Sequence, residues 1–373
     1  MAGLWCGHCK RKYSLDEVLW RCECGSVLDI EFEANFPIQE IMGRAPNLWR
    51  YRESIPLARD GNIISMGEGF TPMVEEDIDG VSVHLKLEYM FPTGSFKDRG
   101  ASVLVSKMRE LGVKDAIEDS SGNAGCAIAA YCAKGKIDCH IYVPDRAPVE
   151  KLTQIGMYGS SIERISGDRE AVAAAALRAA EQGYYASHSW NPFFLQGTKT
   201  LAFEVCEQLN WRAPNTLIVP VGNGTLLLGA YIGFRDLLAG GIIDKMPRLI
   251  GVQAAPCSPL FQMFKGGLED IPPITQGDTI AEGIAIAKPI RGGQIIEAIK
   301  ESKGDIISVR DSQIQESLRM MGRVGYYIEP TSAVAIAGAK TYLKGATPGE
   351  TIVIPLTGTG LKATQKMMGL GMD

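Results

Sequence analysis

The residue best suited to chemistry in this sequence is Lys97, which stands where an extended segment gives way to a helical pattern. Turn-forming residues and Phe96 surround it, in the stretch Pro92 to Gly100. A lysine that is partly removed from water loses its proton more easily. The neutral amine can then attack an aldehyde and form a Schiff base. The sequence therefore predicts that Lys97 is a nucleophile.

A polar turn follows, made of Ser120, Ser121, Gly122 and Asn123, between a strand-like run and a helical one. Backbone N–H groups at the start of a helix suit an anion, so this turn could bind a carboxylate. Asn123 could hydrogen-bond a ring hydroxyl. The alternative is an ordinary helix N-cap, a place that Ser and Asn both favour.

Two glycine turns also follow apolar runs. The first is Gly222-Asn223-Gly224-Thr225, continued by Leu226, and it precedes a helical stretch. That order aims N–H groups at a phosphate. The loop lacks the lysine of a Walker motif, and Leu227 stands where the dinucleotide motif needs a small residue. The second turn begins at Thr357. Taken alone, each could equally be a tight turn between strand and helix.

Four cysteines lie close together near the beginning of the sequence: Cys6, Cys9, Cys22 and Cys24. Paired thiolates on two tight turns of a small β-hairpin module are typical of a tetrahedral zinc site. Because protein would fill all four positions, the zinc would be structural. His8 is an alternative ligand, and a ribbon without metal or four reduced thiols are the other interpretations. The remaining five cysteines have apolar neighbours and are expected in the core.

Composition narrows the class of protein. The chain has 373 residues, 46% of them apolar and 22% charged, with a net charge of −5. That length predicts two domains plus an appendage, and the acidic balance argues against a nucleic-acid binder. There is no apolar stretch that could span a bilayer and no secretion signal, so we expect a cytoplasmic protein that does not bind membranes.

The elements that must position these residues alternate between strand and helix patterns. Short apolar runs bounded by Pro or Gly are typical of buried parallel strands. The pattern predicts an α/β fold with parallel sheets. The predicted strands are Val81 to Leu87, Asp115 to Glu118, Ile141 to Pro144, Ile218 to Pro220 and Ile352 to Leu356. The predicted helices are Gly100 to Leu111, Ala124 to Ala133, Pro148 to Tyr158, Glu170 to Glu181 and Leu226 to Leu238.

The motifs, taken in order, resemble threonine synthase and more broadly the tryptophan-synthase-β-like, fold-type II pyridoxal-phosphate enzymes. The segments that carry the resemblance are Lys86 to Tyr89, Pro92 to Gly100, the Ser-Ser-Gly-Asn turn and the two glycine loops. The cysteine ribbon resembles one carried by some threonine synthases. The resemblance implies a two-domain parallel-sheet fold with an N-terminal zinc-ribbon-like module, and a homodimer.

The same resemblance implies a role for each site residue. Lys97 would carry pyridoxal 5′-phosphate and move protons at the substrate's α and β carbons. The loop from Gly222 to Leu226 would hold the cofactor phosphate, Asn123 its ring hydroxyl, and Thr357 its pyridine nitrogen. A hydroxyl beside that nitrogen makes the cofactor a milder electron sink, which suits elimination and replacement. The substrate would contact Lys86, Ser120, Ser121, Gly122 and Ser189.

The implied domains are a ribbon module over residues 1–33, a large α/β domain over 34–96 and 189–373, and a small α/β domain over 97–188. The cofactor is expected between the two α/β domains. The first expectation for activity is a lyase that converts O-phosphohomoserine to threonine and phosphate.

Three residues depart from the family pattern around the substrate phosphate. Ala124 replaces a frequent Thr, His188 an Asn, and Phe194 an Arg. Either another residue, such as Arg99 or Lys199, supplies the charge, or the substrate differs. A serine or threonine ammonia-lyase, or a β-replacement enzyme acting on a β-substituted alanine, is then the alternative. Phe194 and its aromatic neighbours are expected in the core. A non-catalytic binding protein that uses the ribbon is the alternative of another class.

Overall fold

The computed structural model describes residues 2–145, 147, 149–167, 169–274 and 277–370. The chain forms two compact units. Unit 1 consists of Met1–Gly69 and Lys97–Thr200, and unit 2 consists of Phe70–Phe96 and Leu201–Asp373.

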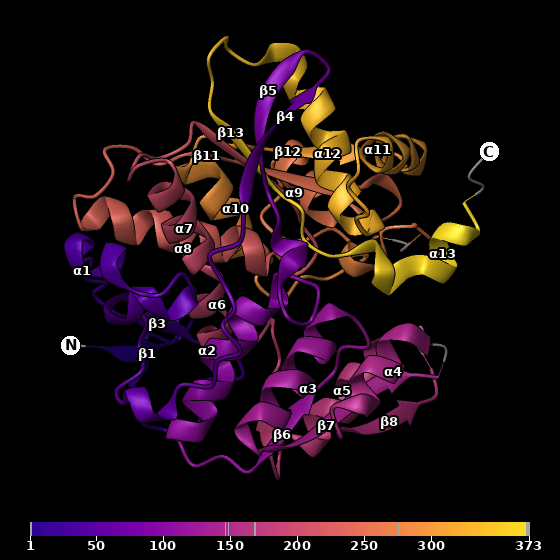
Figure 1. Cartoon of the computed structure of the whole chain (residues 1–373). Coiled ribbons are helices and arrows are strands. Elements are labelled where there is room, and N and C mark those ends of the chain that lie inside the picture. Colours follow the sequence, from indigo (N-terminus) through magenta and orange to yellow (C-terminus); the bar gives the residue numbers. More distant parts are fainter. Residues whose placement is uncertain (1, 146, 148, 168, 275–276, 371–373) are drawn as a thin grey trace. The chain divides into compact units, whose positions relative to one another are not determined.

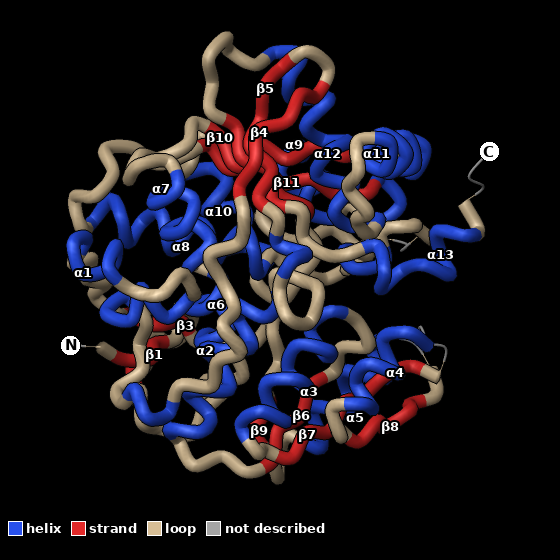
Figure 2. Tube along the Cα trace, in the orientation of Figure 1, coloured by secondary structure: helices blue, strands red, loops and turns tan. Residues whose placement is uncertain are grey.

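Unit 1 is built on a four-stranded sheet whose strands are all parallel, in the order β8-β7-β6-β9 (Figure 2). Its strands are β6 (Asp115–Glu118), β7 (Asp138–Pro144), β8 (Ser161–Ile165) and β9 (Tyr184–Tyr185). Neighbouring residues of β6 enter different apolar clusters. Ala116 packs in the cluster that contains α2 and α3, and Ile117 packs with Ala176 of α5. Helices therefore cover both faces, as expected for a parallel sheet.

The helices of unit 1 are α1 (Ile38–Gly43), α2 (Lys97–Glu110), α3 (Asn123–Gly135), α4 (Val149–Met157), α5 (Arg169–Ala179) and α6 (Pro192–Thr198) (Figure 1). Helix α2 packs against both α3 and α6. A small antiparallel sheet precedes them, in the order β2-β1-β3, with β1 (Gly3–Trp5), β2 (Lys12–Tyr13) and β3 (Asp29–Glu31).

The packing of the first 69 residues differs from the predicted domain plan. Leu4, Cys6 and Cys22 of the ribbon belong to the same apolar cluster as residues of α2 and α3. Leu48, Trp49, Ile55 and Leu57 cluster with Val103 of α2. The segment 34–69 therefore joins unit 1, whereas the sequence analysis placed it in the large domain. The domains themselves, as independently folding parts, stay a prediction.

Unit 2 is built on a six-stranded sheet in the order β12-β11-β10-β13-β5-β4. Its strands are β4 (Met73–Ile78), β5 (Val81–Lys86), β10 (Thr216–Pro220), β11 (Arg248–Ala254), β12 (Asp305–Val309) and β13 (Ile352–Pro355). Only β4 runs antiparallel. The expected α/β fold with parallel strands is present, but this sheet is mixed, because its edge strand β4 is antiparallel. The reason is the turn Asp79-Gly80, whose φ angles of +53° and +83° are those of a tight hairpin turn.

Helices lie on both faces of this sheet as well. A Cβ built on Gly251 of β11 would meet Leu227 of α8 and Ile299 of α10, while the next residue, Val252, meets Gly338 of α12. The helices of unit 2 are α7 (Thr200–Gln208), α8 (Thr225–Ala239), α9 (Pro259–Gly266), α10 (Gly292–Glu301), α11 (Asp311–Arg323), α12 (Pro330–Tyr342) and α13 (Thr364–Met368).

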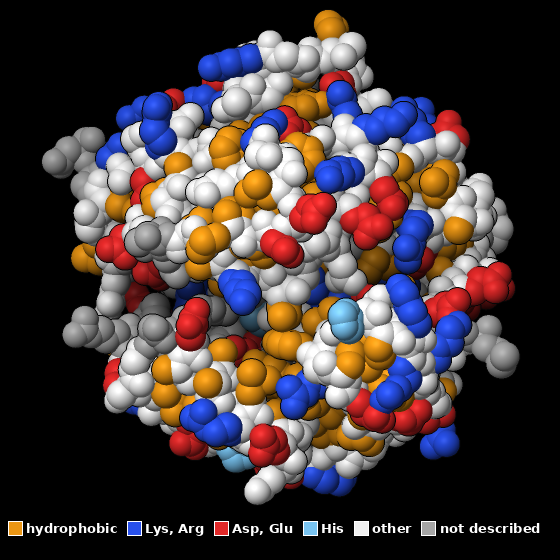
Figure 3. Space-filling view, turned by 180° about the vertical axis from the view of Figure 1, so that it is seen from behind, with side chains coloured by type: hydrophobic (Ala, Val, Ile, Leu, Met, Phe, Trp, Pro, Cys, Tyr) orange, Lys and Arg blue, Asp and Glu red, His pale blue; other side chains and the backbone are white. Residues whose placement is uncertain are grey.

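All the strands and helices predicted from the sequence are present among the described residues, with ends shifted by up to three residues. Pro148, the predicted start of one helix, lies outside the described residues. Phe193 and Phe194 are completely buried, and the five scattered cysteines are free and buried, as expected. On the face seen in Figure 3, basic and acidic side chains are interspersed. Among the described residues, no helix combines the length and apolar character needed to cross a membrane.

Candidate active site

Lys97 is the first residue of α2. The N–H groups at this end of a helix have no partner within the helix and carry a partial positive charge. The side chain is partly buried, and Nζ lies 5.6 Å from the centre of the Phe194 ring. A positive helix end acts against a second positive charge on the amine. The position therefore suits the predicted nucleophile.

The crossing of α2 and α6 brings Phe194 to this position. A Cβ on Gly100 would fall 2.3 Å from Cε1 of Phe194, and a Cβ on Gly197 would fall 2.0 Å from the carbonyl oxygen of Arg99. Both distances are far below van der Waals contact, so only glycine fits at these two positions. The two glycines let the helices approach closely enough to place the aromatic ring beside the amine.

The polar turn predicted to bind a carboxylate lies between β6 and α3. Its N–H at Gly122 donates to Oγ of Ser120 over 3.2 Å. Gly122 is also the N-cap of the 13-residue helix α3, and as a glycine it provides no side-chain cap. A Cβ on Gly125 would fall 1.9 Å from the carbonyl oxygen of Ser120, so the turn closes tightly on the helix. The geometry agrees with an anion-binding turn.

The segment from Ser187 to Asn191 reaches the same edge of the sheet. It follows β9, which is the parallel neighbour of β6, and the ends of parallel strands meet at one edge. The Ser187 and Ser189 hydroxyls lie 3.3 Å apart, and Asn191 caps α6 while its amide donates to the Tyr184 hydroxyl over 2.8 Å. Burial raises the pKa of Tyr184 to about 12, so this hydroxyl stays protonated. The segment is therefore held firmly in place.

Glu118 holds His188 in this segment. The carboxylate accepts a hydrogen bond from the His188 backbone N–H over 3.1 Å, and the other oxygen lies 2.8 Å from Nδ1. Glu118 is completely buried and His188 is 5% exposed. The sequence analysis did not single out Glu118, although a carboxylate at the end of a buried strand was a visible signal.

The predicted phosphate loop belongs to unit 2. It leads from β10 into the 15-residue helix α8, whose N-cap is Gly224 with a φ of +74°. A Cβ on Gly222 would fall 2.8 Å from Cα of Ile284, and one on Gly224 would fall 2.3 Å from Cδ1 of Ile295. Packing against these isoleucines therefore requires glycine at both positions, and the loop stands at the positive end of a long helix, a place that suits a phosphate.

Thr357 follows β13, the parallel neighbour of β10, so it lies at the same edge of the sheet as the loop. Its hydroxyl is 3.0 Å from the Ser332 hydroxyl and 3.4 Å from a carboxylate oxygen of Glu329. Glu329 and Ser332 are both buried at the start of α12. The sequence analysis missed these two residues, because they lie some 25 residues before their partner.

Lys86, the last residue of β5, already has two hydrogen-bond partners within unit 2. Nζ lies 2.9 Å from a carboxylate oxygen of Glu204 and donates to the carbonyl oxygen of Thr71 over 2.5 Å. Neither side chain of the ion pair is exposed. A substrate phosphate could bind Lys86 only in competition with Glu204.

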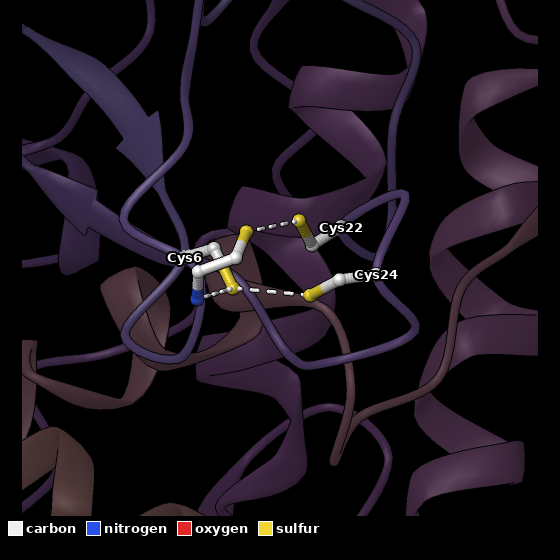
Figure 4. Close-up of side chains that lie close together, drawn as sticks. Cys6, Cys22 and Cys24 are labelled. Carbon is white, nitrogen blue, oxygen red and sulfur yellow. Dashed lines mark hydrogen bonds between the residues drawn. The ribbon is translucent and has the colours of Figure 1, made fainter.

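The four N-terminal cysteines come together in unit 1. Their sulfur atoms all lie within 4.8 Å of one another, with Cys6 and Cys24 at 3.6 Å and Cys9 and Cys22 at 3.4 Å (Figure 4). Four sulfurs around one zinc ion at about 2.3 Å lie roughly 3.8 Å apart. His8 is not in this group, which is the one cluster of metal-binding type among the described residues.

Comparison with known proteins agrees with this geometry. The model of the family "Pyridoxal-phosphate dependent enzyme" matches residues 64–358. The chain belongs to this family. It is 36% identical to the threonine synthase of Methanocaldococcus jannaschii, over 96% of this chain and 92% of that protein. It is 32% identical to the threonine synthase of Methanosarcina acetivorans, over 99% and 94%. These relatives place it in the threonine synthase family.

The fold is shared more widely. Maize serine racemase superposes with a TM-score of 0.71 at 23% identity, covering 88% of this chain and 98% of that one. At that identity the likeness describes the fold, an α/β fold like that of fold-type II pyridoxal-phosphate enzymes. Family membership makes this chain a pyridoxal-phosphate-dependent enzyme and sets aside the non-catalytic binding protein.

The residues present suit the cofactor. The loop from Gly222 to Thr225 leads into α8, so its backbone N–H groups stand at the positive start of a helix, where an anion can bind. The amine of Lys97 lies beside an aromatic ring at a positive helix end. The Thr357 hydroxyl is the kind of group that accompanies a pyridine nitrogen without fixing its proton. The assignment of each residue to its role stays a prediction.

Proposed function

We propose that this enzyme converts O-phospho-L-homoserine and water to L-threonine and inorganic phosphate. The observation that carries the proposal is the likeness to threonine synthases over nearly the whole chain. The lyase reaction breaks the bond between the substrate's γ carbon and its phosphate oxygen. Water then supplies the hydroxyl group of the product at the β carbon, and a proton completes the methyl group.

Unit 1 would bind and move protons on the substrate. The amine of Lys97 would take the proton from the α carbon and later deliver protons to the substrate carbons. The turn of Ser120, Ser121, Gly122 and Asn123 would hold the carboxylate at the start of α3, and Ser189 would contact the substrate. Asn123 would also hydrogen-bond the ring hydroxyl of the cofactor.

Unit 2 would contribute the rest of the cofactor contacts. Residues Gly222 to Leu226 would hold its phosphate, and Thr357 its pyridine nitrogen. When bound, pyridoxal phosphate supplies an electron sink for the pair of electrons left at the α carbon. The Thr357 hydroxyl, with Glu329 and Ser332 around it, would not force the pyridine nitrogen to stay protonated, so the cofactor would withdraw electrons less strongly. Lys86 is the predicted substrate contact with the weakest support, since Glu204 engages it.

Product analysis tests the proposal. The cofactor-loaded enzyme is given O-phospho-L-homoserine, and threonine is measured by mass spectrometry together with released phosphate. We expect equal amounts of both products, and none from Lys97→Ala. Lys134→Ala is the matched control, because Lys134 is exposed on α3. No turnover in a sample that shows the visible absorption band of the Lys97-bound cofactor would exclude this substrate.

A second candidate is an ammonia-lyase for serine or threonine, or a β-replacement enzyme. The observation in its favour is Phe194, whose apolar ring lies beside the Lys97 amine where the family pattern has an arginine. Ammonia and a 2-oxo acid formed from serine or threonine, in the absence of threonine formation from the phosphorylated substrate, would support it.

We also propose that the four cysteines hold one structural zinc ion, for which their spacing and their mutual distances are the support. The homodimer implied by the family resemblance remains a prediction. Sedimentation of the cofactor-loaded enzyme would measure it.

A further inference from the structure

A pocket of about 410 Å³ lies between α11 and α13 of unit 2, and it has no part in the function proposed so far (Figure 1). One face of α11 lines it, because the lining residues from Gln315 to Arg323 recur at helical spacing. Two contacts join α11 and the segment after it to α13 and its C-terminal end. Arg319 donates to the carbonyl oxygen of Leu370 over 3.1 Å, and the hydroxyls of Tyr327 and Thr364 lie 3.4 Å apart.

The size and the lining of this pocket are those of a small-molecule site. Such sites typically measure about 300–1,000 Å³ and are mostly apolar, with a few polar groups that orient the ligand. The apolar lining residues are Leu318, Tyr326, Tyr327, Ile328, Met367 and Met368. Tyr327 is 46% exposed and Met368 is 69% exposed, so water now contacts apolar surface that a ligand would cover. The apolar part of the ligand would therefore pack against this lining.

The charged residues of the pocket are both basic. Arg319 and Arg323 lie four residues apart on the same face of α11, and none of the described lining residues is acidic. Arg323 is exposed and makes no ion pair with any residue that the structure describes. Two like charges at this spacing repel each other, and an anion between them would remove that repulsion. Guanidinium groups also form strong hydrogen bonds with anionic oxygens.

The pocket is connected to the turn that begins at Thr357. The backbone N–H of Gly360 donates to the carbonyl oxygen of Tyr327 over 2.9 Å, and Ile328 pairs with Thr359 in an antiparallel bridge. Tyr327 and Ile328 line the pocket with their side chains' residues and hold this turn with their backbones. A ligand that displaces Tyr327 would therefore also displace the turn.

We propose that this pocket binds a small molecule with an apolar body and one anionic group, and that this ligand lowers the activity of the enzyme. The body packs against the tyrosines and methionines, and the anionic group accepts hydrogen bonds from Arg323 and Arg319. The effect reaches the active site through the turn at Thr357. The binding site does not depend on the proposed substrate, whereas the effect on activity rests on the proposed function and on the predicted contact of Thr357 with the cofactor.

Binding is tested with anilinonaphthalene sulfonate, an aromatic dye with one negative charge that fluoresces when it leaves water. It is titrated into the cofactor-loaded enzyme and into Gly322→Leu. Gly322 lines the pocket, and a Cβ there has nothing within 4 Å, so the leucine fills the pocket without a clash. We expect the dye to bind at least about tenfold more weakly to Gly322→Leu. Gly293→Leu is the matched control, because Gly293 of α10 is exposed and has the same open space.

The role of the charge is tested by a second variant and a second dye. We expect Arg323→Gln to weaken the sulfonate dye about 3- to 30-fold and to leave the uncharged dye phenylnaphthylamine unaffected. Arg109→Gln is the control, because Arg109 is an exposed arginine in the last turn of another helix, α2. An unchanged affinity of Arg323→Gln for the sulfonate dye, or an equal loss for both dyes, would overturn the anionic class of the ligand.

The effect on activity is measured with O-phospho-L-homoserine in the presence and absence of the sulfonate dye. We expect kcat of the wild type to fall about fivefold and that of Gly322→Leu to be insensitive to the dye. Dye binding that is equal in wild type and Gly322→Leu would overturn the site. Dye binding that depends on Gly322, with kcat unchanged, would keep the site and overturn its effect on activity. Absence of threonine formation would reject the proposed function, while the two binding tests would still decide the site.

Discussion

Lys86 and Glu204 form an ion pair with no exposed surface, in which Nζ lies 2.9 Å from the carboxylate oxygen. The carbonyl oxygen of Thr71 accepts a second hydrogen bond from the same ammonium group. Removing one partner of such a pair leaves an uncompensated charge in the core. Replacing both partners by apolar residues removes that penalty.

We therefore expect Lys86→Met to destabilise the protein by about 3–5 kcal/mol, and the double variant Lys86→Met with Glu204→Met to recover most of that loss. Denaturant unfolding measures both. Lys340→Met is the control, since its pair with Glu316 is exposed and should contribute at most about 1 kcal/mol. A double variant as unstable as the single one would show that the pair is not the cause.

Substitution of Lys86 also distinguishes a role in binding the substrate from a purely structural role in the ion pair. If it binds substrate phosphate, Lys86→Ala should weaken a phosphorylated substrate and spare an unphosphorylated one. If its role is the ion pair alone, both substrates should be affected equally. Steady-state kinetics with O-phospho-L-homoserine and with L-serine measure the difference, at a temperature where the variant is folded.

Gly100→Ala tests the crossing of α2 and α6. The new methyl group would fall 2.3 Å from the Phe194 ring, so the ring or the helix must move. We expect a loss of about 1–3 kcal/mol in unfolding free energy, as for other overpacked cores. The matched control is Gly293→Ala in α10, which has nothing within 4 Å and should be neutral or slightly stabilising.

A second substitution checks the cause of that loss. Gly100→Ala combined with Phe194→Leu removes the clashing ring atoms and should be less destabilised than the sum of the two single changes. Simple additivity would mean that a methyl group at position 100 is unfavourable for a reason other than Phe194.

Local signals predicted a large part of this molecule. The turn before α2 was predicted because turn residues precede a helical pattern, and the glycine turns because short apolar runs precede them. The roles of Lys97 and of the glycine loops stay predictions. The hairpin of β4 and β5 was missed, although Asp79-Gly80 is a strong turn signal.

Contacts between distant residues could not be predicted in the same way. Glu118 lies 70 residues from His188, and Lys86 lies 118 residues from Glu204. Spacing along the chain carries no information on such pairs, because the sheet order brings them together. Lys86 therefore matched a family motif while its buried partner stayed unrecognised.

Glu350 provides a test of stability against pH. Burial alone would raise the pKa of its carboxyl, but hydrogen bonds from Thr216, Tyr342 and Arg248 outweigh burial and lower the pKa below its ordinary value. The folded state then holds its carboxylate more strongly than the unfolded chain does. The resulting stability is present above the unfolded pKa of about 4.3, and it is lost as the pH falls toward the lower folded pKa.

The free energy of unfolding of wild type and of Glu350→Gln should therefore differ by a constant amount from about pH 7 to pH 5, and the difference should shrink below about pH 4. Glu316→Gln is the control, because Glu316 pairs with Lys340 on the surface and should change stability little at any pH. A difference for Glu350→Gln that stays constant down to about pH 2 would contradict the lowered pKa.

Metal removal tests the cysteine ribbon. We expect one zinc per chain by elemental analysis, and none in Cys24→Ser. Cys257→Ser is the control, since Cys257 is a buried free cysteine of unit 2.

Trp20, two residues before Cys22, packs edge-to-face on Tyr185 and Trp190, with ring centres 4.9 and 5.7 Å apart. Because metal binding to such ribbons contributes directly to folding, a chelator should change the near-ultraviolet circular dichroism of these aromatics and lower the thermal midpoint. Wild type that contains no zinc after growth in zinc-supplemented medium, and that shows no response to a chelator, would mean that the four thiols are structural without a metal.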